Sequence, residues 1–259
     1  MVDHGAAKPV TNLSGLRRIP LLRQFAPEPS SNPHESVANG VLRPVVFGAN
    51  DGLVSNLALV MGVAGASAEP GVIVLAGIAG LLAGAFSMGV GEYISVRSQQ
   101  ELLAYQVEFQ RRQLRETPEQ ERGILKAAYR ERGLTEAEAE QFVGRVFAEP
   151  EHAVSLLLHE ELGLDARSIG SPWAAAVGSF AAFTLGALVP LVPYLLWQSP
   201  TAFVLSLGIS LAALALLGYG ISRLTHRPGL YSSVRQVCLG GIAAAVTYAV
   251  GTLVGAHTA

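Results

Sequence analysis

GVIVLAGIAGLLAGAFSMGVGEYISVR, residues 71–97, is the stretch of sequence that decides the fold. Its first twenty-one residues carry no charge, and Glu92 and Arg97 follow them. A helix from Val72 to Val96 would be about 37 Å long at 1.5 Å per residue, which exceeds the roughly 30 Å of a bilayer core. The stretch therefore predicts a membrane-spanning helix with a carboxylate inside it.

An acid inside the membrane points to function. A central carboxylate costs about 2.5–3.5 kcal/mol on insertion scales, so such a residue usually faces a cavity or a partner. Met88 lies one turn before Glu92 on the same face. Glycines leave parts of this helix and of the last apolar run bare, and we expect close helix contacts there, within one chain or in a dimer. These glycines are Gly77, Gly80, Gly84, Gly89, Gly91, Gly251 and Gly255.

The composition identifies an integral membrane protein. Of the 259 residues, 50% are hydrophobic and 15% are charged, whereas soluble domains carry about 25% charged residues. The lipid bilayer is therefore an expected partner, and no nucleic-acid partner is expected. The one cysteine, Cys238, excludes a disulfide framework and a cysteine metal cluster within one chain.

We predict an all-α, polytopic fold with five transmembrane helices and a helical domain inserted between the second and the third. The expected spans are residues 44–66, 72–96, 173–197, 201–221 and 237–254. The expected divisions are a disordered tail over 1–40, the first two spans within 41–96, the insert over 97–168 and the last three spans within 169–259. Pro190 and Pro193 are expected to kink or break the third span.

Helix start and stop signals divide the insert. The second span is expected to continue as helix to about Arg115, because no helix breaker follows it. Beyond that point, short helices are expected between N-cap patterns and glycines. The start signals are Thr117 with Pro118, Thr135 with Glu138, and Pro150, and the end signals are Gly133 and Gly163.

The basic residues predict the orientation. All 18 Lys and Arg residues lie before the first span, in the insert, or between the fourth and fifth spans. Five spans place these three segments on one side of the membrane, and basic residues accumulate on the cytoplasmic side. We therefore expect a cytoplasmic amino terminus and insert and an external carboxyl terminus. The short loops and the lack of a targeting peptide predict a bacterial inner membrane.

Two acids are expected in the cytoplasmic half of the membrane. Asp51 lies seven residues, about 10 Å, into the first span, and Glu92 lies at comparable depth in the antiparallel second span. With Met88 and the amides of Asn50 and Asn56, they form a candidate transport path and a site for a divalent transition metal. The alternative is structural, with Asp51 bonded within the hairpin and Glu92 reaching the surface.

Carboxylates held close together also share protons, which predicts exchange of a divalent cation against protons. A twofold axis beside the first two spans would duplicate these residues around one pore, so a homodimer is expected. In the insert, Glu108, His152 and His159 are candidates for weaker metal ligands. Charged residues on short amphipathic helices are, however, more often solvated faces.

These residues and their surroundings resemble the vacuolar iron transporter family. The resemblance covers the five expected spans and the insert. It rests on FGANDGLVSN at 47–56, SMGVGEYISVRSQ at 87–99, HEELGLD at 159–165, GALVPLVPY at 186–194 and TYAVGTLVG at 247–255. It implies a dimer that exports Fe²⁺ or Mn²⁺ from the cytosol in exchange for protons, with the metal as substrate and no cofactor. It also implies that Asp51 and Met88 line the path, that Glu92 belongs to the same motif, and that the insert is a metal-binding domain.

The insert departs from the family pattern at positions where glutamate or methionine is expected. The residues found there are Gln110, Gln113, Ile124, Leu157 and Leu158. Glu121 and Glu161 are kept, and they are the expected metal ligands of the insert. Because an amide is a neutral and poorer ligand than a carboxylate, we expect this cluster to bind metal weakly.

Two alternatives come from other classes of protein. A non-transporting membrane protein would use the insert to dock or regulate a partner, and its buried acids would be structural. An intramembrane enzyme is disfavoured, because all six histidines lie outside the spans or at their ends and no Ser/His or Asp/Asp arrangement occurs within them. We therefore expect a transporter and not an enzyme.

Overall fold

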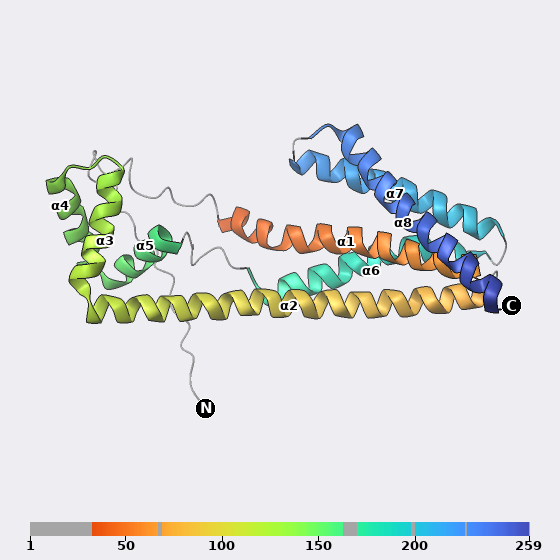
Figure 1. The fold of residues 1–259 in the computed structure, drawn as a ribbon, viewed down its shortest axis with the longest axis horizontal. Helices are drawn as coiled ribbons and strands as arrows, with labels where there is room; N and C mark the ends of the chain where they lie inside the picture. The colour runs from red at the N-terminus through yellow and green to blue at the C-terminus, as the bar shows by residue number, and fades with distance from the viewer. Residues whose placement is uncertain (1–32, 67–68, 163–169, 198–199, 226, 259) are drawn as a thin grey trace, which may run out of the picture. The chain divides into compact units, whose positions relative to one another are not determined.

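The computed structural model describes residues 33–66, 69–162, 170–197, 200–225 and 227–258. All regular elements among these residues are helices, as predicted (Figure 1). The chain divides into two compact units. Of the described residues, one unit contains those within 38–97 and 170–258, and the other contains those within 33–37 and 98–162. Each unit has its own apolar core and is described separately.

In the described part of the chain, five helices are long and apolar enough to cross a membrane, which confirms the predicted number of spans. They are α1 (Pro33–Ala66), α2 (Pro70–Glu116), α6 (Pro172–Leu196), α7 (Thr201–Thr225) and α8 (Gly229–Thr258). As expected, α2 continues past the apolar stretch, for 47 residues in all.

The structure differs from the sequence predictions in two segments that contain proline. Residues 33–40, predicted to belong to a disordered tail, form the start of α1, and the rest of that tail lies outside the described residues. Proline suits the first turn of a helix, where its missing N–H has no partner to lose. Helix α6 continues through Pro190 and Pro193, so a break there, one of the two outcomes predicted, is wrong. The Ser206 hydroxyl of α7 donates to the Pro190 carbonyl at 2.7 Å and joins α7 to this part of α6.

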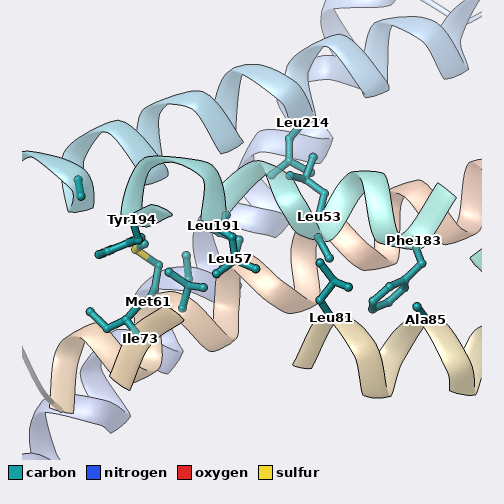
Figure 2. Packing of buried hydrophobic residues seen from close by; sticks show 14 residues of the cluster. Leu53, Leu57, Met61, Ile73, Leu81, Ala85, Phe183, Leu191, Tyr194 and Leu214 are labelled. Carbon is teal, nitrogen blue, oxygen red and sulfur yellow. The ribbon is translucent and has the colours of Figure 1, made fainter. Parts of the chain in front are cut away.

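The membrane-spanning unit packs around a shared apolar core, which Figure 2 shows from close by. Its members include Leu53, Leu57 and Met61 of α1, Leu81 and Ala85 of α2, Phe183 and Leu191 of α6, and Leu214 of α7. Glycines bring the backbones together here. A Cβ added to Gly251 of α8, for example, would overlap with the backbone of Gly62 in α1. Gly255 likewise meets backbone, whereas Gly77, Gly80 and Gly84 meet side chains of neighbouring helices, Gly89 meets both, and Gly91 faces open space.

In the insert, three short helices pack with the end of α2. They are α3 (Pro118–Glu131), α4 (Glu136–Val146) and α5 (Pro150–Leu162). Their core is built around Leu125, Tyr129, Phe142 and Leu157, and the ring centroids of Tyr129 and Phe142 are 4.3 Å apart. Leu114 of α2 packs against this core.

Most predicted helix ends in the insert are confirmed. Thr135 and Glu138 form a complete capping box, and Gly133 adopts φ +100°, a conformation that favours glycine. Thr117 precedes α3 as expected, but its hydroxyl donates back to the Gln113 carbonyl at 3.1 Å instead of capping the helix. The predicted end signal Gly163 lies outside the described residues, and α5 is described to Leu162.

Candidate functional site

Asp51 lies on an outward face of α1. Phe47 and Ser55, one turn before and one turn after it, are exposed, and Asp51 itself is half-buried. The Ser55 hydroxyl donates to the backbone carbonyl of Asp51 at 2.5 Å. Among the described residues, no hydrogen bond or ion pair engages the Asp51 carboxylate. The structural alternative, in which this acid is bonded within the hairpin, therefore finds no support in the described chain.

Two other helices enclose the remaining sides of this turn of α1. Gly48 and Gly52 lie so close to the backbone of α6 that neither position has room for a side chain. On another side, the Gln236 amide of α8 donates to the side-chain oxygen of Asn50 at 2.6 Å. That oxygen is the atom by which Asn50 was expected to face a metal, and it is bonded to α8 instead. The sequence did not predict a role for Gln236. Its position as a polar residue beside an apolar run was the only sign of one.

Asn56 does not share a face with Asp51. Five residues along a helix correspond to a rotation of about 140°, and the Asn56 side chain is buried in the core, with 2% of the residue exposed. Its amide nitrogen donates to the Ala187 carbonyl of α6 at 2.6 Å. Its oxygen has no partner among the described atoms and faces Gly80 of α2. The structure thus places this predicted path residue at the junction of α1, α2 and α6.

Met88 and Glu92 share one face of α2, as predicted. Both are half-buried, and Met88 packs against the apolar core. Like Asp51, the Glu92 carboxylate makes no hydrogen bond or ion pair within the described part of the chain. The two acids are not bonded to each other. Close to Asp51 along the helices, α6 contacts both α1 and α2. The backbone of Phe183 meets Gly52 of α1, and its ring meets Gly84 of α2.

Two acids of the insert that were expected to bind metal, Glu121 and Glu108, already have partners. Glu121 is buried, and its Oε2 accepts a hydrogen bond from the Gln110 amide at 2.7 Å, with 4% and 3% of the two residues exposed. Glu108 lies 3.7 Å from Arg111 and 3.3 Å from Arg115 in ion pairs. Leu157 and Leu158, which replace the expected methionines, are buried.

The predicted histidines are not gathered into a metal cluster. The His152 Nδ1 lies 2.7 Å from a Glu149 oxygen, and its buried Nε2 has no hydrogen-bond partner among the described residues. His159 is exposed, and the side chain of Glu161 lies outside the described structure. Within the described residues, no group of three or more His, Cys, Asp or Glu side chains is placed to hold a metal ion. The ligand roles of these residues stay predictions.

Two ion pairs of the insert were not foreseen. Arg132 contacts both carboxylate oxygens of Glu160, whose side chain is only 6% exposed. Arg111 likewise engages both oxygens of Glu151, at 3.1 and 2.8 Å. The hydrogen bond from Arg111 lowers the pKa of Glu151. These pairs join segments 28 and 40 residues apart, which sequence periodicity does not reveal.

Known proteins match this chain over most of its length. The model of the VIT family matches residues 42–252. Vacuolar iron transporter 1 of Oryza sativa subsp. japonica is 29% identical over 234 residues, which cover 89% of this chain and 93% of that protein. The protein of the same name from Arabidopsis thaliana is 29% identical over 222 residues, covering 84% and 87%. The vacuolar iron transporter of Acanthamoeba castellanii is 35% identical over 219 residues, covering 83% and 78%.

These comparisons agree with the resemblance found in the sequence motifs. The family is one of transporters and not of enzymes, as expected for this chain. The match extends from residue 42, where the first candidate span begins, to residue 252 within α8, and it includes the insert. This chain therefore belongs to the VIT family of membrane transporters.

Proposed function

We propose that this protein exports Fe²⁺ or Mn²⁺ from the cytosol in exchange for protons, through a dimeric pore lined by α1 and α2. The relatives named above are iron transporters, which supports a metal substrate. The observation that carries the proposal is the Asp51 carboxylate, which lies on an outward face of a membrane helix with no partner in the described chain. An acid at such a position needs an ion, a proton or another subunit to offset its cost.

The outward face of α2 supports the dimer. Ala79, Ala83, Ser87 and Gly91 are exposed and follow one another at intervals of four residues, so they form a strip of small side chains. Small residues allow two membrane helices to approach closely. A twofold axis beside this strip would bring two copies of Asp51, Met88 and Glu92 to one pore.

Cross-linking tests the dimer. In a Cys238→Ser background, Gly91→Cys is expected to give a cross-linked dimer on mild oxidation in membranes. Gly208→Cys on α7 is the matched control, because Gly208 is also exposed with open space around it. Cross-linking at Gly208 and not at Gly91 would place the interface elsewhere.

The proposed exchange of protons rests on Asp51 and Glu92. Carboxylates in a poorly hydrated site take up protons when the metal leaves, so that metal movement in one direction drives protons in the other. The distribution of basic residues supports a cytoplasmic amino terminus and insert. The relatives are named vacuolar transporters and come from eukaryotes, so they lend no support to the predicted bacterial inner membrane.

For the insert we propose weak metal binding, with Glu121 and Glu161 as ligands and Glu108, His152 and His159 as lesser contributors. Metal would have to displace the Gln110 amide from Glu121 and two arginines from Glu108. This competition supports low affinity.

The decisive experiment measures metal entry into proteoliposomes that contain a pH-sensitive dye. Fe²⁺, Mn²⁺, Co²⁺, Zn²⁺ and Ca²⁺ are tested with the wild type, Asp51→Asn, and Glu131→Gln as a control at an exposed acid of the insert. Metal-dependent proton movement that only Asp51→Asn abolishes would support the proposal and identify the ion. Silence for every ion, with folded dimers present, would instead favour the alternative of a membrane protein whose insert docks a partner.

A further inference from the structure

We propose that Gln236 is a positioning residue, whose amide bond to Asn50 fixes the turn of α1 that carries Asp51. The inference rests on the proposed function in so far as Asp51 handles the transported ion. It starts from a contact between residues 186 positions apart, in which the Gln236 Nε2 donates to the Asn50 Oδ1 at 2.6 Å.

The turn of α1 around Asp51 has three distinct sides. On the first, Gly48 and Gly52 meet the backbone of α6 without intervening side chains. On the second, Asn50 is bonded to α8. On the third, Asp51 is left without a partner among the described residues. Successive residues of a helix point about 100° apart, so fixing Asn50 also fixes the direction in which Asp51 projects.

The bond adds a polar contact between α1 and α8. Toward their other ends, these two helices pack through small residues, with Gly251 against Gly62 and Gly255 against Ala66. Gln236 lies 15 residues before Gly251, or roughly 22 Å along the helix at 1.5 Å per residue. The amide pair is therefore a second, distant point of attachment, and it lies beside Asp51 and not in the tightly packed region.

The chemistry of the pair suits positioning and not ion binding. Both groups are neutral amides, so the bond persists whether Asp51 is charged, protonated or bound to metal. Both residues are half-buried, which shields the bond from competing water. The bond uses one of the two lone pairs of the Asn50 oxygen and fixes its direction, so we assign the pair its effect on the ion through the placement of Asp51.

The test compares Gln236→Ala with Ser233→Ala in the full-length protein. Ser233 is on the same helix, and its hydroxyl donates to the Ala215 carbonyl of α7 at 2.8 Å. In proteoliposomes, loss of a neutral hydrogen bond that positions an ion ligand is expected to raise the KM for metal by about 2- to 10-fold in Gln236→Ala. Ser233→Ala is expected to leave KM unchanged. The Asn50→Ala, Gln236→Ala double variant should be no worse than either single variant.

A second readout does not depend on transport. The rate at which a hydrophobic carbodiimide modifies Asp51 is followed by peptide mass spectrometry, and it should change by at least about 2-fold in Gln236→Ala and not in Ser233→Ala. If Gln236→Ala changes the labelling rate but the wild type transports no metal, the proposed function is refuted and the positioning role is retained. Normal KM and normal labelling in Gln236→Ala would overturn the inference, whether or not the protein transports metal.

Discussion

The acids of the membrane-spanning unit and those of the insert are treated in opposite ways by the fold. In the spans, the carboxylates of Asp51 and Glu92 have no partner among the described residues. In the insert, the buried acids Glu121 and Glu160 receive hydrogen bonds from Gln110 and Arg132. A buried acid with donors around it stabilises a fold, whereas an unpaired acid in an apolar setting opposes folding and is retained for another reason. The comparison thus distinguishes buried acids that receive hydrogen bonds from span acids that have no partner among the described residues.

The largest effect is expected where an acid is unpaired. Asp51→Asn should reduce the rate of metal transport by about 10- to 100-fold or more. Changes to residues that only support metal ligands already have effects of this size. It should leave the thermal unfolding temperature unchanged or raise it, because an uncompensated carboxylate is removed. The two measurements are made on the same preparation. A marked fall in unfolding temperature would show that Asp51 is structural and would break the comparison.

In the insert, removing the partner of a buried acid should cost stability. Arg132→Met leaves Glu160 buried without its two charged hydrogen bonds and is expected to destabilise the insert by about 1–3 kcal/mol. Hydrogen exchange of α3 and α5 peptides in the full-length protein measures this change. Arg130→Met, which removes a pair between two exposed side chains, is the control and should cost less than about 1 kcal/mol. Equal effects would mean that burial of Glu160 is unimportant.

Gln110→Glu converts a paired acid of the insert into one of two facing carboxylates. Placed within hydrogen-bond distance of Glu121, the new charge should destabilise the insert by about 1–3 kcal/mol without metal. Mn²⁺ should recover this loss in the variant and have little effect on the wild type. Hydrogen exchange with and without Mn²⁺ checks both statements, with Gln120→Glu on an exposed position as control. An equal response of the wild type would show that its insert binds metal well.

The smallest effect concerns pH. The hydrogen bond from Arg111 lowers the pKa of Glu151 below its ordinary value of 4.5. The stability from this pair is therefore present above pH 4.5 and is lost as the pH falls through the lowered value. Because the Glu151 side chain is 56% exposed, a few tenths of a kcal/mol are expected. Between pH 5 and 3, the free energy of unfolding should fall slightly less with pH for Glu151→Gln than for the wild type. A steeper fall in the variant would contradict the assignment.

Local signals in the sequence were sufficient to predict the helices. The charge-free run before Glu92 predicted a span, and Thr135 with Glu138 predicted a capping box, because the physical cause of each lies within a few residues. The same reasoning placed Met88 and Glu92 on one face. It could not establish what stands opposite that face, since helical spacing says nothing about neighbouring helices.

The contacts that decide the role of each polar residue are long-range. The bond between Asn50 and Gln236 joins residues 186 apart, and the bond between Asn56 and Ala187 joins residues 131 apart. Both amides were predicted to line a path together with Asp51. The structure shows that each is bonded to another helix, and only the three-dimensional packing of α6 and α8 against α1 reveals this.

The glycine contacts between α1 and α6 limit how the transporter can change shape. Where Gly48 and Gly52 meet α6, the nearest atoms are backbone atoms, which cannot change rotamer if the helices slide or rotate. Packed backbones of this kind move together. By contrast, α2 meets α1 at Gly80 through the flexible side chain of Leu59, which can change rotamer. An inward-to-outward transition would therefore carry α1 and α6 as one rigid body and take up its motion at the surface of α2.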